Sequence, residues 1–110
     1  MAVEQFGEQG LELALFRGVQ AATPEAALVV WSAPEGVETG IWEATPGRFG
    51  ATRDGYHEVC QILSGRATLA PTGGEPVQIG PGDTLVTPAG WTGVWEVHET
   101  LRKTYVVLDA

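Results

Sequence analysis

The stretch of sequence that decides the fold is EVCQILSG, residues 58–65, together with PGDTLVTPAG, residues 81–90. In the first stretch a strand is predicted to run from Glu58 to a turn at Gly65, where a hairpin requires the positive φ that glycine adopts most easily. In the second, Gly82-Asp83 and Pro88-Ala89-Gly90 place turn residues on both sides of a short apolar run. The two stretches therefore predict short strands joined by tight turns.

Outward from these stretches, the same pattern recurs along the chain and predicts an all-β protein, because short apolar or alternating runs are each closed by a turn signal. The predicted strands are residues 11–16, 26–31, 40–44, 56–63, 66–70, 77–79, 84–87, 93–98 and 103–108. Of these, 56–63 and 66–70 are predicted to form a hairpin, and the polar stretch 96–103 is predicted to be a loop. The 15 glycines and 7 prolines disfavour a helical bundle, so at most one helical turn is expected.

Composition narrows the class of protein further. A chain of 110 residues fits one domain, and 44% hydrophobic against 18% charged residues supports a packed core. The net charge of −8 would repel nucleic acid and anionic lipid surfaces, so we expect neither as a partner. Cys60 is the only cysteine and no secretory signal is evident, which favours the cytoplasm. The longest apolar run, 26–31, is too short to cross a membrane.

The two opening stretches resemble the paired motifs of the cupin superfamily. Three further segments, GIWEATPG (40–47), GVWEV (93–97) and RKTY (102–105), are similar to the subgroup typified by the ureidoglycine aminohydrolase cupin domain. The resemblance implies a single-domain cupin-type jelly-roll β-barrel, also called a double-stranded β-helix, over residues 26–108, preceded by an N-terminal strand and arm over residues 1–25. It also implies a role in nitrogen or amino-acid metabolism.

The resemblance makes a metal site the first question, and here the ligand pattern is broken. Metal-binding cupins supply His-x-His and a Glu from the first motif and another His from the second, and of these four ligands only Glu58 is present. The positions that would hold the histidines are occupied by Thr52 and Asp54, by Ala51 and Arg53, or by Arg53 and Gly55, according to the spacing used, and by Gly93 in the second motif. We therefore expect no cofactor and no metal.

Two weaker metal sites remain as alternatives. The first is a metal bound through His57 or His98. His57, however, adjoins Glu58 in a strand and so points to the opposite face, and His98 is also expected outside the barrel, so that both histidines are expected at solvent or at a dimer interface. Asp54, Glu58 and Cys60 share one strand parity and could form a weak divalent-metal site, although three clustered anions would repel each other.

Glu58 is the candidate catalytic residue. If it points inward, the two-residue period places Tyr56, Cys60 and Ile62 on the same side. A desolvated Glu with a raised pKa serves as a general acid or base. The alternative is a carboxylate that only hydrogen-bonds to Tyr56, Tyr105 or Lys103.

Aromatic and cationic side chains supply a candidate ligand pocket. The candidate ligand-binding residues are Trp42, Arg48, Tyr56, Cys60, Trp91, Trp95, Lys103 and Tyr105. Among them Trp42 and Trp95 serve either as pocket wall or as core, and Trp91 lies in a turn as an exposed residue or lid. Arg48 and Lys103 are either anchors for an acidic ligand or surface charges, and Cys60 is a small core residue rather than a nucleophile.

These residues favour a small-molecule-binding cupin, either an enzyme of isomerase, lyase or hydrolase type acting on a small polar or acidic metabolite, or a non-catalytic binding, sensor or accessory protein. A third possibility is an assembly module, which predicts a filled barrel without a cavity. The outward positions of Val59 and Leu63 predict a second buried surface, and hence a homodimer.

Overall fold

The computed structural model describes residues 12–13, 19–21 and 25–110. The predicted strand 11–16 coincides with a described strand only at 12–13, and the rest of it, like most of the predicted arm 1–25, lies outside the described residues. The strands are β1 (Glu12–Leu13), β2 (Val19–Ala21), β3 (Glu25–Ala33), β4 (Val37–Ala44), β5 (Gly47–Thr52), β6 (Tyr56–Pro71), β7 (Val77–Ile79), β8 (Thr84–Thr87) and β9 (Thr92–Asp109).

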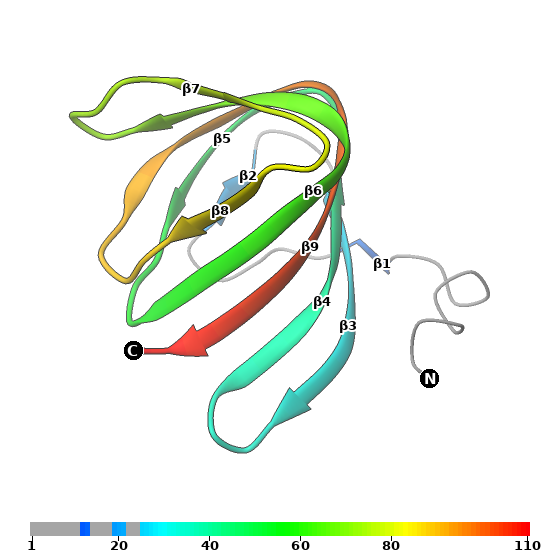
Figure 1. Ribbon diagram of the computed structural model, residues 1–110, viewed down its shortest axis with the longest axis vertical. Coiled ribbons are helices and arrows are strands. Elements are labelled where there is room, and N and C mark those ends of the chain that lie inside the picture. The colour runs from blue at the N-terminus through cyan, green and yellow to red at the C-terminus, as the bar shows by residue number, and fades with distance from the viewer. Residues whose placement is uncertain (1–11, 14–18, 22–24) are drawn as a thin grey trace.

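The fold is all-β, as predicted, and every strand pairing is antiparallel. One sheet follows the order β1-β3-β4-β9-β5-β2, and β6 joins it by pairing with β7, β8 and β9. Figure 1 shows the long strands β6 (green) and β9 (orange to red) side by side, with β3 and β4 forming a hairpin at the lower end. No helix is found in the described part of the chain, and so none that could span a membrane.

The predicted hairpin between 56–63 and 66–70 is wrong, because both runs belong to the single strand β6. Its backbone groups pair with β9 from Tyr56 to Pro71, with register shifts between Ile62 and Ala67. Gly65 does have a positive φ, of 91°. It marks a bend in a continuous strand, and a Cβ here would clash with the backbone carbonyl of Thr100.

The loop predicted at 96–103 is also wrong, since β9 continues through it. Its polar side chains misled the prediction: Glu96 and Glu99 are exposed, while Val97 and Leu101 point into the core. An antiparallel strand can have one face in solvent and the other on the core, so polar residues at alternate positions do not interrupt it. The strand β5, which the sequence did not indicate, fills the gap beside β9 and buries Phe49.

An aromatic cluster from β4, β5 and β9 forms the centre of the core. The rings of Phe49 and Trp95 are nearly parallel, at 9°, with centroids 6.2 Å apart. Trp42 lies tilted against both, with centroid distances of 5.6 Å to Phe49 and 6.4 Å to Trp95. Offset and tilted contacts at these distances are the favourable arrangements for aromatic rings.

The opposite face of the sheet carries a row of uncharged residues, here called the outer row. Strand register places Val86, Val59, Val106, Thr39 and Trp31 next to one another on β8, β6, β9, β4 and β3. The two ends of the row are the most exposed, at 58% for Val86 and 56% for Trp31. Leu63, also predicted to face outward, is 43% exposed.

Candidate functional site

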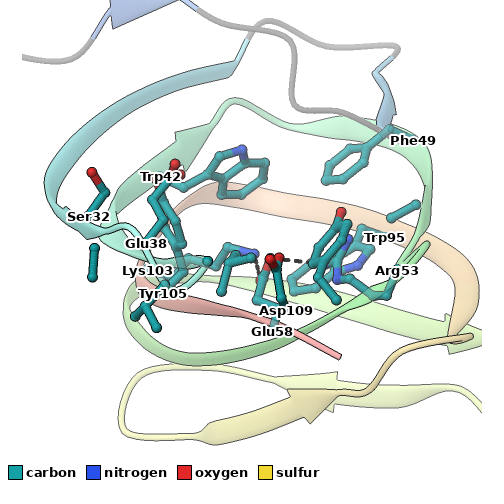
Figure 2. Close-up of a pocket in the computed structure, with 16 residues that line it drawn as sticks. Ser32, Glu38, Trp42, Phe49, Arg53, Glu58, Trp95, Lys103, Tyr105 and Asp109 are labelled. Atoms are coloured by element: carbon teal, nitrogen blue, oxygen red, sulfur yellow. Dashed lines mark hydrogen bonds and ion pairs between the residues drawn. The ribbon is translucent and has the colours of Figure 1, made fainter.

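A cavity of about 500 Å³ lies on the inner side of the curved sheet, lined by residues of β3, β4, β5, β6 and β9 and the segments beside them. Its inner part consists of the buried lining residues, and its rim of the half-buried or exposed ones. The inner part combines the aromatic cluster with three charged side chains, Arg53, Glu58 and Lys103. Figure 2 shows the Lys103 amine and the Glu58 carboxylate meeting at the centre, with Trp42 above them.

The three buried charged side chains form one cluster, here called the charged cluster. Lys103 Nζ donates a hydrogen bond of 2.6 Å to Glu58 Oε2, and an Arg53 terminal nitrogen lies 3.3 Å from Glu58 Oε1. The side chains of all three are exposed by 10% or less. Both carboxylate oxygens therefore have a cationic partner, and the cluster carries two positive charges against one negative charge.

This arrangement keeps Glu58 ionised. Burial by itself would raise the pKa of Glu58, but the charges of Lys103 and Arg53 and the hydrogen bond from Lys103 together hold that pKa below its ordinary value. The expectation of a raised pKa for Glu58 is therefore wrong. The alternative interpretation, a carboxylate hydrogen-bonded to Lys103, describes its ground state.

Lys103 is held in place by the aromatic cluster as well as by Glu58. Its Nζ lies 4.7 Å from the ring centroid of Trp42 and 4.4 Å from that of Trp95. An ammonium between two indole faces is stabilised by the negative face of each ring, which compensates for part of its lost hydration. β9 brings Lys103 and Trp95 inward on the same strand parity.

Arg53 was missed as a functional residue, although it occupies one of the positions at which the cupin pattern places a histidine. It follows β5, and its backbone pairs with the 88–91 turn through Arg53 N–H to Trp91 O, 2.9 Å, and Gly90 N–H to Arg53 O, 2.7 Å. Its Nε donates to Thr87 Oγ1 at 2.9 Å, and its guanidinium lies 5.9 Å from the ring centroids of Tyr56 and Trp91. Local periodicity does not reach beyond the end of a strand, so only the histidine spacing pointed to this residue.

Tyr105, a buried lining residue, positions a carboxylate of the rim. Tyr105 Oη donates to Glu38 Oε2 at 2.9 Å. Burial, followed by this hydrogen bond and the charge of Glu38, raises the pKa of Tyr105, so it stays a phenol and a donor. Asp109 and Ser32 are exposed lining residues of the same rim.

Six of the predicted site residues line the cavity: Trp42, Tyr56, Glu58, Trp95, Lys103 and Tyr105. The other three do not line it. Arg48 is exposed on β5, and Trp91 is half-buried, with its ring centroid 5.9 Å from the Arg53 guanidinium. Cys60 lies in the core, where burial above all raises the pKa of its thiol to about 11, which agrees with a core residue rather than a nucleophile.

The residues present do not fit the transition-metal site that the cupin resemblance implies. Glu58, the one matching ligand, already has a cation on each oxygen, and a dication there would lie beside two positive charges. Asp54 is exposed while Cys60 is buried, and no group of three or more metal-ligating side chains gathers among the described residues.

The two histidines have structural partners and are half-buried rather than fully exposed. His57 Nδ1 accepts a hydrogen bond of 2.9 Å from the backbone N–H of Ala89, which ties β6 to the turn that follows β8. His98 Nε2 lies 2.7 Å from Thr68 Oγ1, between neighbouring strands.

Comparison with known proteins identifies relatives of this architecture. The family model described as the EutQ-like cupin domain matches residues 31–105. The EutQ protein of Clostridium difficile has a similar structure, with a TM-score of 0.70 and 19% identity over 81% of this chain and 71% of that one. A protein of unknown function from Rhizobium leguminosarum has a TM-score of 0.68 and 25% identity, over 78% of this chain and 82% of that one. A DUF861 family protein from Thermotoga maritima is 32% identical, with a TM-score of 0.56, over 59% of this chain and 73% of that one. Among curated proteins, none matches.

Proposed function

The chain belongs to the EutQ-like cupin domain family, and from this premise we propose that its cavity binds a small acidic metabolite. The observation that carries the proposal is the excess positive charge of the charged cluster. Arg53 and Lys103 face a single carboxylate, Glu58, in a chain whose net charge is −8. An anionic ligand group would balance this excess in a site where little water competes for the donors.

The donors available to such a ligand support the proposal. Guanidinium carries five N–H groups and ammonium three, and only part of these is used by Glu58 and Thr87. The cavity volume of about 500 Å³ falls within the usual range for small-molecule sites, about 300–1,000 Å³. Its aromatic walls offer apolar contact around a few polar anchors, the common composition of such sites.

Enzymatic activity is the second candidate function, and Glu58 is its candidate catalytic residue. Glu58 is held at the cavity surface as a carboxylate, the ionised form that a general base requires, although its lowered pKa makes it a weak base. Lys103, whose Nζ lies 2.6 Å from Glu58 Oε2, is placed to stabilise the negative charge that develops on a substrate as its proton passes to Glu58. This chemistry suits an isomerase, lyase or hydrolase. The resemblance to the ureidoglycine aminohydrolase type supports a role in nitrogen or amino-acid metabolism. An assembly module with a filled barrel is disfavoured by the cavity.

Binding is tested by titrating the protein with acetate, propionate, succinate and citrate while following tryptophan fluorescence and amide NMR shifts. At least one carboxylate is expected to bind, and Lys103→Met is expected to weaken it about tenfold, since it removes a charge-assisted hydrogen bond. Arg48→Met is the matched control, because it removes an exposed cation outside the cavity. Equal losses in the two variants, or no binding by any of the probes, would contradict the proposal.

A further inference from the structure

We propose that the ligand is a small zwitterion whose carboxylate lies against Arg53 and Lys103 and whose ammonium group lies against Glu38 at the rim. This inference rests on the proposed function, since it assigns the second end of the ligand that the charged cluster binds.

The charges of the cavity lining are segregated by depth. The two cations, Arg53 and Lys103, are both in the buried inner part, where they exceed Glu58 by one charge. The remaining charged lining residues, Glu38 and Asp109, are both acidic and both at the rim. A ligand with an anion inside and a cation outside matches both parts, whereas a dianion would place its second charge against two carboxylates.

Glu38 is a positioned group rather than a solvated surface acid. It is half-buried, and its Oε2 accepts the hydrogen bond from Tyr105 Oη. Tyr105 is fixed in turn, because its backbone carbonyl accepts a 2.7 Å hydrogen bond from Thr39 Oγ1. Gly40 leaves room for the phenol: a Cβ there would lie 2.9 Å from Tyr105 Oη and would clash with the carbonyl of Leu28.

The hydrogen bond from Tyr105 leaves most of the Glu38 carboxylate available, because an ionised carboxylate has about four acceptor sites. None of the cations in the described residues forms an ion pair with Glu38. Glu43, which lies on the same strand, does have such a partner in Arg102, at 3.1 Å. A ligand ammonium would give Glu38 the kind of partner that Glu43 already has.

The test compares two probe series on the full chain by amide NMR titration at pH 7. One series is the straight-chain carboxylates from acetate to hexanoate, and the other is the ω-amino carboxylates of the same lengths, from glycine to 6-aminohexanoate. At the best length, the amino carboxylate is expected to bind about fivefold more tightly than its amine-free counterpart, the value of a partly exposed ion pair of about 1 kcal/mol.

Substitutions test whether Glu38 at the rim causes the preference for the amino carboxylates. Glu38→Gln is expected to reduce the fivefold ratio to nearly one while leaving the affinity for the simple carboxylates unchanged or higher. Glu35→Gln removes an exposed acid of the β3–β4 turn that does not line the cavity, and is expected to preserve the ratio. If Glu38→Gln unfolds the protein, Tyr105→Phe, which removes only the positioning hydroxyl, is expected to lower the ratio instead.

The outcomes separate this inference from the proposed function. Binding of simple carboxylates without a preference for the amino series, or a preference that survives Glu38→Gln, would overturn the zwitterion and leave the acidic-ligand site standing. No binding by either series would overturn both. Equal weakening of the ratio in Glu35→Gln and Glu38→Gln would show a long-range charge effect and would also overturn the assignment of Glu38.

Discussion

Replacing Glu58 by Gln tests whether the charged cluster is organised around that carboxylate. The substitution keeps the shape and one hydrogen-bond acceptor, but it leaves Arg53 and Lys103, whose side chains are 4% and 6% exposed, without an anion. Removing one member of a buried ion pair typically costs 3–5 kcal/mol, and because Gln still accepts a hydrogen bond we expect the lower end, about 3 kcal/mol. For a chain of this length that corresponds to a fall of roughly 13 °C in Tm.

The assay is urea unfolding followed by tryptophan fluorescence at pH 7, with far-UV circular dichroism to confirm the folded state. Glu43→Gln is the matched control: its pair with Arg102 has side chains 36% and 42% exposed, so its loss is expected to cost no more than about 0.5 kcal/mol. Lys103→Met leaves one carboxylate facing one guanidinium and is expected to cost less than Glu58→Gln. If Glu58→Gln destabilises the protein no more than Glu43→Gln does, the electrostatic account of the cluster is wrong.

Further predictions concern acid stability, thiol reactivity, the bend in β6 and the outer row. Because the pKa of Glu58 is held below its ordinary value of 4.5, the stability that its ion pairs contribute is complete above that pH and is lost as the pH falls through the lower pKa of the folded state. The free energy of unfolding, measured by urea titration, should thus fall as the pH is lowered below about 4.5, and less steeply in Glu58→Gln. Ellman's reagent at pH 8 should label Cys60 only at the rate of unfolding, and rapid labelling of the native protein would contradict its burial. Gly65→Ala should lower stability by about 2 kcal/mol or more in the same urea assay, because it combines a positive φ with a backbone clash; an unchanged midpoint would show that the bend relaxes. Sedimentation should show a homodimer, since the outer row is an uncharged surface in a chain of net charge −8. The double substitution Trp31→Glu and Val86→Glu should give monomers, and a monomeric wild type at micromolar concentrations would contradict the prediction.

The sequence by itself determined the fold class and one wall of the cavity. Turn residues and alternating runs specify short antiparallel strands, because glycine, proline and the two-residue period act over neighbouring positions. The same period placed Tyr56, Glu58, Cys60 and Ile62 on one side of a strand, and the structure has them facing the cavity or the core. The cupin motifs predicted the architecture that the family match supports.

Only the tertiary structure decided how far each strand runs. The residues at 64–65 and 96–103 carry only local information, which fits a bend within a strand or a strand with one polar face as well as it fits a turn or a loop. What keeps β6 and β9 continuous is their pairing with each other and with strands distant in sequence, which satisfies their backbone hydrogen bonds. No local pattern contains that information.

The electrostatics of the site were likewise decided by the tertiary structure. Parity along β6 indicates that Glu58 points inward, but its pKa depends on which cations arrive from elsewhere in the chain. Lys103 comes from β9, 45 positions away, and Arg53 from the segment after β5, while Arg48, an equally plausible anchor by sequence, lies at the surface. Glu58, which the sequence makes a candidate general acid or base with a raised pKa, is in the structure a buried anion between two cations. The reason is that a charge interacts through space with whatever the fold brings within a few ångströms of it.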